Sequence, residues 1–307
     1  MTIKEIKKVC VIGAGTMGLQ ISLVAAVHGY KVAVCDVAEE AIQKAPGHHR
    51  WMIGVIKLGD DANKVSDEKA LSLLSYTTDA ATAAKDADII SESVPEQLAL
   101  KRVVHAQFEE LCPPNAILST NTSTLLVSDI EPALAHPERF LAMHFHAGLA
   151  PLVDIMKGTK ASDETIDIVK RFVQSIGLVP QIMNKEQGGY VFNTMLAMWY
   201  VGGLIPVANG VATPEEVDRA WMLVTGQEVG PFGSMDGVGL DVVYGAVNEA
   251  SQGTSPLSMF GSLADVVKPH IDRGELGMKT GKGFYIYPNP AYQQPGFLTG
   301  QREGKSI

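Results

Sequence analysis

Cysteine and basic charge are both scarce in this chain of 307 residues. Its three cysteines are too few for a disulfide framework, so we expect reduced thiols, with Cys10 and Cys35 in neighbouring core strands. Charged residues make up only 19% of the chain, and acids exceed bases by 34 to 25, for a net charge of −9. Since no basic run is long enough to offset this balance, we expect no nucleic-acid partner.

Long hydrophobic runs are nearly absent as well. The most apolar stretch, residues 190–208, approaches the length of a membrane span but includes two glycines and a proline, and we expect a buried helix there rather than a membrane partner. The segment MTIKEIKK runs straight into the first expected strand and leaves no room for a secretion signal, so cytoplasm is the expected compartment. The length favours two domains over one.

A glycine-rich turn follows the first apolar run of the chain. Residues 9–12 lead into GAGTMG at 13–18, and a second apolar run ends at an acid 18 residues further on. Strand, glycine turn, helix, strand and acid in this order are the pattern of a dinucleotide-binding unit. The acid can accept hydrogen bonds from ribose hydroxyls and would repel the extra phosphate of NADP, so NAD is the expected cofactor. The expected binding residues are Gly13, Gly15, Thr16, Met17, Gly18 and Asp36.

Strands and helices alternate as far as about residue 186. Expected strands lie at 74–77, 87–91, 116–119, 140–145, 152–156 and 178–182, and expected helices at 79–85, 96–111 and 162–176. This alternation predicts an α/β fold with a Rossmann-type, doubly wound and mainly parallel sheet in residues 1–186. Residues 187–307 are expected to form a mostly α-helical domain for substrate binding and dimerisation, with a loose tail from residue 288.

His144 lies at the end of an expected strand, on the carboxyl edge where open α/β sheets bind ligands. Taking hydride from a carbon that carries a hydroxyl needs a base for the hydroxyl proton, and imidazole titrates near working pH. Asp154, in the next expected strand, is the nearest candidate to orient that imidazole. Short polar residues at 121–124 follow another strand on the same edge.

Some nearby residues have simpler interpretations. Strand alternation points His146 to the same side as His144, where it could shape the pocket. A histidine beside an aspartate also suggests a metal site, but no third ligand clusters with them in the sequence, so no metal is expected. Met195, Met198 and Trp199 recur at helical spacing and are expected in the core. No role is expected for His28, His48, His49, His105, His136 and His270.

The chain resembles the L-3-hydroxyacyl-CoA dehydrogenase family, which includes L-gulonate 3-dehydrogenase and its crystallin relative. The matching pieces occur in order along nearly the whole chain. They are GAGTMG at 13–18, ESVPE at 92–96, STNTSTL at 119–125, MHF at 143–145 with PLVD at 151–154, GGYVFNTML around Asn193, VGPFGSMDGVGLD at 229–241 and GMKTGKGFYIY at 277–287.

The resemblance implies roles for the matching residues. His144 would be the base for alcohol oxidation and the acid for ketone reduction, with Asp154 in the place of the family's orienting glutamate. Ser123 and Asn193 would hydrogen-bond the substrate oxygen and position the nicotinamide side of the pocket. Contacts with the nicotinamide half of NAD are implied for Glu96, Lys101, Asn121 and Lys279, the last reaching over from the second domain.

Three departures from the family pattern concern the pocket. HFHAG at 144–148 replaces the usual HFFNP, and the path to the partner acid is shorter. That acid is Asp154, with one methylene less than glutamate, for which a shorter loop could compensate. Gly-Gly-Tyr at 188–190 replaces Pro-Gly-Phe. Because the changed segment lines the pocket, these departures put the identity of the substrate in question.

We therefore expect a homodimeric, NAD-dependent dehydrogenase that interconverts a short-chain 3-hydroxyacyl-CoA and its 3-ketoacyl-CoA. A dehydrogenase of a free 3-hydroxy acid such as L-gulonate or carnitine remains an alternative, as does an inactive crystallin-like or NAD-sensing protein. Gly202 and Gly203 would suit a close helix interface between two copies. Several basic residues could hold the phosphates of CoA, although neighbouring acidic residues offset their positive charge. They are Lys44, Arg50, Lys57, Lys64 and Lys69.

Overall fold

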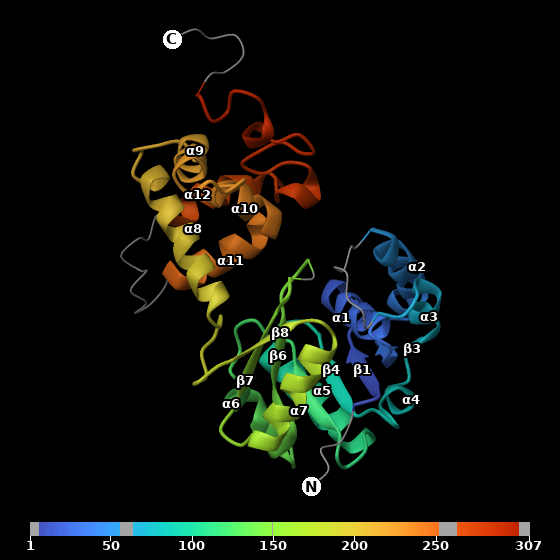
Figure 1. Ribbon diagram of the computed structural model, residues 1–307. Coiled ribbons are helices and arrows are strands. Elements are labelled where there is room, and N and C mark those ends of the chain that lie inside the picture. The colour runs from blue at the N-terminus through green and yellow to red at the C-terminus, as the bar shows by residue number, and fades with distance from the viewer. Residues whose placement is uncertain (1–5, 56–63, 149, 252–262, 301–307) are drawn as a thin grey trace. The chain divides into compact units, whose positions relative to one another are not determined.

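The computed structural model describes residues 6–55, 64–148, 150–251 and 263–300. The chain divides into two compact units, Met1–Tyr190 and Val191–Ile307 (Figure 1). The first unit contains the sheet, and the second is helical.

The first unit is built on one eight-stranded sheet with the order β3-β2-β1-β4-β5-β6-β7-β8. The chain order reverses between β1 and β4, which is the topological switch point where open α/β sheets bind ligands. All neighbouring strands are parallel except β6 and β7, which are antiparallel. The strands are β1 (Lys8–Ile12), β2 (Lys31–Cys35), β3 (Leu74–Thr77), β4 (Ile89–Glu92), β5 (Ile117–Thr120), β6 (Phe140–Phe145), β7 (Leu152–Lys157) and β8 (Val179–Ile182). The predicted doubly wound, mainly parallel sheet is confirmed.

Helices cover both faces of this sheet. Successive strand residues point to opposite faces, so Val9 and Val11 pack with α1, α2 and α7, whereas Cys10 and Ile12 pack with α4, α5 and α6. The helices are α1 (Thr16–Val27), α2 (Glu39–Val55), α3 (Asp67–Ser72), α4 (Ala80–Ala84), α5 (Leu98–Leu111), α6 (Val127–Ile130) and α7 (Asp163–Ser175). All three cysteines are buried and free, as expected.

The second unit packs helices around a core that includes Leu204 and Phe232. Its helices are α8 (Phe192–Ala208), α9 (Pro214–Thr225), α10 (Pro231–Val238), α11 (Leu240–Ser251) and α12 (Leu263–Asp272). The buried Asp218 carboxylate joins three segments, because it accepts the N–H groups of Phe232 and Gly233 at the start of α10 and the hydroxyl of Tyr285. Burial raises the pKa of Asp218 to about 6, although these hydrogen bonds oppose the rise. Among the described residues, no helix is long and apolar enough to cross a membrane.

Two sequence predictions for the second unit are wrong. Met195 and Met198 are 59% and 53% exposed, so they lie outside the core, because the buried face of α8 is formed further along by Tyr200, Val201 and Leu204. The tail is not loose over residues 288–300. Its aromatic side chain at Phe297 is buried, and Arg219 donates a hydrogen bond to the Phe297 carbonyl.

Candidate active site

The glycine turn after β1 has the form that a dinucleotide-binding loop requires. Gly13 has φ of +99°, and a Cβ there would lie 2.6 Å from the carbonyl oxygen of Ser93. A Cβ at Gly18 would overlap the Gly13 carbonyl, so α1 can pack against the turn only if Gly18 has no side chain. At Gly15 a Cβ would meet no atom within 4 Å, which leaves open space over the first turn of α1. N–H groups in a first helical turn lack intrahelical acceptors, so this space suits a pyrophosphate.

Asp36, directly after β2, fastens this turn. One carboxylate oxygen accepts the N–H of Ala14 at 2.7 Å and the other accepts the N–H of Ala38 at 2.9 Å. A carboxylate offers about four acceptor positions, so capacity remains for ribose hydroxyls. A cavity of about 550 Å³ lies over the turn. It is lined by Ala14, Gly15, Thr16, Leu19, Gln20, His48, Trp51, Met52 and Gly148.

Glu96 holds the loop that carries Ser123. Its Oε1 accepts the N–H groups of Ser123 and Thr124, both at 2.8 Å, and the hydroxyl of Thr122 at 2.5 Å. Burial alone would raise the pKa of Glu96, but the Thr122 hydrogen bond and the charge of Lys101 outweigh burial and lower it. Glu96 therefore positions the loop of Ser123 as an anion, and its contact with NAD stays a prediction.

Lys101 is completely buried and lies between two carboxylates. Its Nζ is 2.8 Å from Glu92 Oε1 and 3.4 Å from Glu96 Oε2. Asn121, another predicted cofactor residue, accepts the N–H of Phe145 through its side-chain oxygen at 2.8 Å and so fixes the end of β6. Both residues support the loops around the site, and direct contacts with NAD remain predictions for them.

His144 and Asp154 face each other across the antiparallel pair β6–β7. They are direct partners in the register, and His144 Nδ1 lies 3.3 Å from Asp154 Oδ2. The other ring nitrogen, Nε2, lies 3.2 Å from Ser123 Oγ. Burial raises the pKa of the Asp154 carboxyl, but hydrogen bonds from His144 and His146 outweigh burial and hold it below its ordinary value. The ladder register places the shorter acid within reach of the imidazole.

Tyr190 is a site residue that the sequence reasoning missed. Its ring stacks on the imidazole of His144, with centroids 4.7 Å apart and planes 5° from parallel. The hydroxyl donates to the carbonyl of Thr122 at 2.9 Å, and burial raises the pKa of the phenol. The preceding glycines make this placement possible, because a Cβ at Gly188 would lie 2.6 Å from the Thr124 carbonyl oxygen. The change to Gly-Gly-Tyr was visible in the sequence, but nothing there indicated the stacking.

His146 joins the same cluster. Its Nε2 lies 2.9 Å from Asp154 Oδ2, closer than His144, and the two imidazole rings meet edge to face with centroids 4.7 Å apart. The expectation that no third metal ligand clusters with His144 and Asp154 is therefore wrong. Alternation along the strand placed His146 on the correct side, but its hydrogen bond to Asp154 depends on the pairing with β7.

Asn193 and Lys279 belong to the second unit. Asn193 lies in the first turn of α8, and Lys279 Nζ binds both carboxylate oxygens of Asp241 at 2.5 and 2.6 Å. The structure thus brings Ser123, His144 and Asp154 together within the first unit. For Asn193 and Lys279, a place in the same site remains a prediction.

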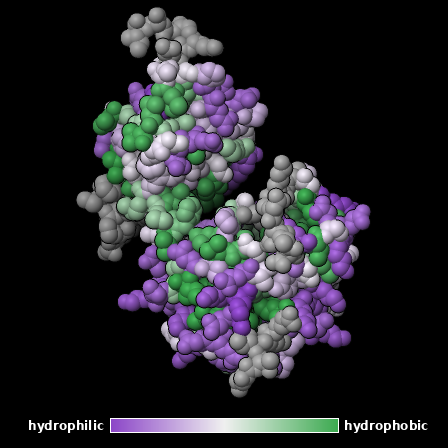
Figure 2. Space-filling model, viewed as in Figure 1, coloured by the Kyte–Doolittle hydropathy of each residue, from purple (hydrophilic) through white to green (hydrophobic). Residues whose placement is uncertain are grey.

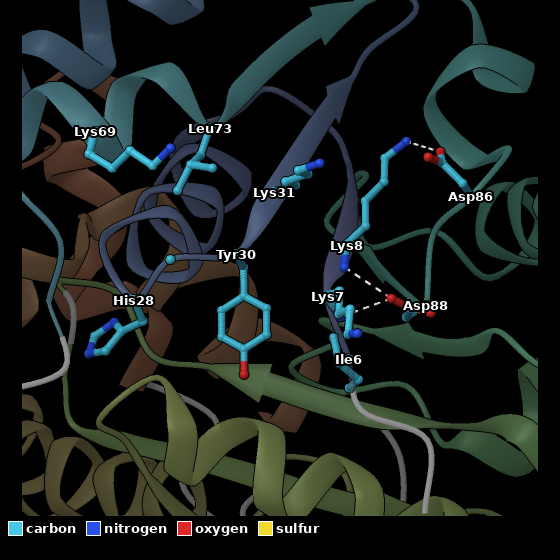
Figure 3. Close-up of a pocket in the computed structure, with 11 residues that line it drawn as sticks. Ile6, Lys7, Lys8, His28, Tyr30, Lys31, Lys69, Leu73, Asp86 and Asp88 are labelled. Atoms are coloured by element: carbon cyan, nitrogen blue, oxygen red, sulfur yellow. Dashed lines mark hydrogen bonds and ion pairs between the residues drawn. The ribbon is translucent and has the colours of Figure 1, made fainter.

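A larger cavity, of about 730 Å³, lies at the amino ends of β1 and β2 (Figure 3). Several lysines line it, but Lys8 Nζ forms an ion pair with Asp86, and Asp88 accepts the backbone N–H groups of Lys7 and Lys8. This is the edge of the sheet opposite to His144. Since open α/β sheets bind ligands at the carboxyl ends of their strands, we assign this cavity no part in the chemistry.

Two family models together match most of the chain. The 3-hydroxyacyl-CoA dehydrogenase NAD binding domain matches residues 8–187, and the C-terminal domain of the same enzymes matches residues 189–287. The chain belongs to the 3-hydroxyacyl-CoA dehydrogenase family. Membership places it among oxidoreductases and confirms NAD as the cofactor.

Some relatives in this family are named for a CoA thioester substrate and others for a substrate without CoA. A probable 3-hydroxybutyryl-CoA dehydrogenase from Deinococcus radiodurans is 31% identical, over 90% of this chain and 99% of its own. A 5-formyl-3-hydroxy-2-methylpyridine 4-carboxylate 5-dehydrogenase from Mesorhizobium japonicum is 28% identical, over 92% and 91%. Among solved structures, a diketoreductase described as acting on dicarbonyl compounds is 34% identical with a TM-score of 0.81, over 92% of this chain and 100% of its own.

The stacked Tyr190 gives a prediction that depends on the expected role of His144 as the base. Tyr190→Ala should lower kcat by about 10-fold, because an imidazole without its stacking partner is held less firmly against Asp154, and small misplacements at a reacting centre are costly. Tyr190→Phe keeps the ring and loses only the hydrogen bond to Thr122, so it should retain most activity. Steady-state NADH absorbance with the two variants measures the difference. Equal losses in both would contradict a role for stacking.

Proposed function

We propose that the chain is an NAD-dependent dehydrogenase that interconverts a short-chain 3-hydroxyacyl-CoA and its 3-ketoacyl-CoA. The observation that carries the proposal is the chain of contacts from Asp154 through His144 to Ser123. It joins an orienting anion, a base and a hydroxyl donor at the carboxyl edge of a sheet whose first turn suits NAD. Family membership supports the same chemistry.

The tautomer of His144 follows from its partner. An ionised Asp154 only accepts hydrogen bonds, so the proton of the neutral ring lies on Nδ1 and the lone pair of Nε2 is left to take a proton. Nε2 removes the proton of the substrate's 3-hydroxyl, and the Ser123 hydroxyl donates a hydrogen bond to the same oxygen. When bound, NAD supplies the acceptor for the hydride from carbon 3. The hydrogen bonds of His144 thus decide which of its two ring nitrogens carries the proton.

Asp154 contributes by stabilising the imidazolium that forms. Its lowered pKa keeps it ionised, so the charge on His144 is balanced across one hydrogen bond. In the direction of ketone reduction, the imidazolium returns its proton to the oxygen from Nε2. Asn193 is proposed to complete the substrate contacts from the second unit.

A free dicarbonyl compound or 3-hydroxy acid is the second candidate substrate. The 34% identity to a diketoreductase favours it, as does the segment His146-Ala147-Gly148 in place of the family pattern. Acids also offset the bases expected to hold CoA phosphates, since Lys44 Nζ lies 2.6 Å from Glu40 on the same helix. Lys57 lies outside the described residues.

One set of assays separates these substrates. NADH formation is followed with 3-hydroxybutyryl-CoA against free 3-hydroxybutyrate, L-gulonate and carnitine, and NADH consumption with a free dicarbonyl compound. The proposal expects the CoA thioester to have the highest kcat/KM. Higher values for a free acid or dicarbonyl would replace it with the second candidate. Binding of NAD with no turnover of any of them would instead favour the inactive, crystallin-like alternative.

A homodimer formed through the second unit is proposed as the working assembly. Apolar side chains are exposed along the first half of α8, among them Phe192, Met195 and Met198, and Figure 2 shows apolar surface on this unit. Gly202 faces open space, but Gly203 packs against Pro231 within the unit, so only the first of the two is available to a partner helix. A monomer mass in sedimentation equilibrium would contradict the proposal.

A further inference from the structure

The end of β6 and the middle of β7 bring three metal-binding side chains to one point. His144 lies near the end of β6, His146 follows directly after that strand, and Asp154 lies opposite His144 on the antiparallel strand. One donor atom from each residue lies within 4.8 Å of the other two. The separations are 3.3 Å from Asp154 Oδ2 to His144 Nδ1 and 2.9 Å to His146 Nε2.

We infer that His144, His146 and Asp154 form a binding site for a divalent transition-metal ion of the zinc class. Two imidazoles and one carboxylate are a donor set that such ions take, with water in the fourth position. The side chains are 5%, 10% and 0% exposed, so the donors are ordered by packing before any ion arrives.

The second carboxylate oxygen is an independent indication of an absent ligand. Asp154 Oδ1 is buried and has no hydrogen-bond partner among the described residues. A buried carboxylate oxygen without a partner carries a substantial desolvation cost. A cation held by Asp154 would offset that cost, whereas the hydrogen bonds from His144 and His146 reach only Oδ2.

Occupancy would switch off the base. A metal ion on His144 Nδ1 takes the lone pair that a proton otherwise occupies, so the proton of the neutral ring lies on Nε2. A protonated Nε2 cannot accept the hydroxyl proton of a substrate, and the bound ion therefore inhibits the dehydrogenase. The inhibition rests on the proposed role of His144, whereas the binding itself does not.

Metal titration of the full chain tests the site. Protein freed of metal with a chelator is titrated with Co²⁺, followed by its visible absorption, and with Zn²⁺ in a calorimeter. We expect one ion per chain, intense absorption typical of tetrahedral Co²⁺, and at least 10-fold weaker binding in His146→Asn. The matched control is His136→Asn, which removes an exposed histidine that also lies beside a carboxylate, 3.3 Å from Glu138. It should bind as wild type does.

The site would be overturned if the wild-type protein showed no saturable binding. It would also be overturned if His146→Asn bound the ion as tightly as wild type does. Nitrogen NMR of the wild-type imidazoles makes the test independent of any variant's folding. The first equivalent of Zn²⁺ should shift Nδ1 of His144 and Nε2 of His146, and shifts confined to other histidines would also overturn it. Activity is read separately. Loss of turnover in step with occupancy, reversed by chelator, supports the switch, whereas full turnover at full occupancy would refute His144 as the base and leave the metal site standing.

Discussion

His144→Gln is expected to lower kcat by about 10²–10⁴-fold, the usual contribution of a positioned general base. Glutamine is close to histidine in size and can still donate to Asp154 Oδ2, but its amide cannot take a proton near neutral pH. The residues that fasten the glycine turn, Gly13 and Asp36, are not touched by this change. The NAD dissociation constant should therefore stay within about 3-fold of wild type, which is under 1 kcal/mol.

Stopped-flow NADH absorbance gives the turnover, and quenching of protein fluorescence gives NAD affinity. The exposed His136 serves again as the control, because His136→Gln should change neither quantity. Near-normal turnover of His144→Gln would show that another group takes the proton. A loss of NAD binding equal to the loss of turnover would show that the variant disturbs the fold rather than the chemistry.

Lys101→Met is expected to destabilise the first unit by about 3–5 kcal/mol, the usual cost of leaving a buried charge without its partner. Lys101 and Glu92 are both completely buried, and Nζ lies 2.8 Å from the carboxylate. Glu92 would keep only neutral donors and His105. An exposed lysine gives the control, since Lys44→Met breaks a surface pair with Glu40 that is worth at most about 1 kcal/mol.

The pH dependence of that loss identifies its cause. Burial alone would raise the pKa of Glu92, but hydrogen bonds and charge from His105 and Lys101 outweigh burial and lower it from 4.5 to about 2. A depressed folded-state pKa stabilises the protein above pH 4.5, and that stabilisation is lost as pH falls toward 2. The deficit of Lys101→Met should therefore shrink in acid.

Urea unfolding across this pH range, with hydrogen exchange of the β4 amides, measures the effect. Glu92→Gln combined with Lys101→Met should recover much of the lost stability, because a neutral amide can still pair with the remaining donors. A deficit that is independent of pH and unchanged in the double variant would assign the loss to packing.

The glycine turn that is expected to hold the cofactor was predictable because its signals are local. Gly13, Gly18 and Asp36 lie within one strand-turn-helix-strand unit, and each is required by backbone geometry that the sequence spacing already encodes. The pairing of His144 with Asp154 could also be predicted from the sequence. The connection at residues 146–151 is too short for a crossover between parallel strands and favours a hairpin.

The rest of the site depends on contacts between distant segments. Tyr190 reaches His144 only because the chain returns past the Ser123 loop, and no periodicity in the sequence records that path. The exposure of Met195 has a similar origin, since helical spacing identifies an apolar face but cannot say whether the same unit covers it. The packed tail was missed because its composition resembles that of a flexible segment, whereas single aromatic residues such as Phe297 anchor it.

The antiparallel ladder of β6 and β7 holds His144 opposite Asp154, whereas the turn between the two strands takes no part in that contact. The proposed acid–base pair is held by cross-strand pairing, so we expect that residues of the turn can be exchanged while His144 and Asp154 keep their contact. Because Gly148 of that turn also borders the cavity over the glycine loop, such changes reshape what is recognised. Substitutions in this turn are therefore expected to alter the choice of substrate while the proposed base stays in place.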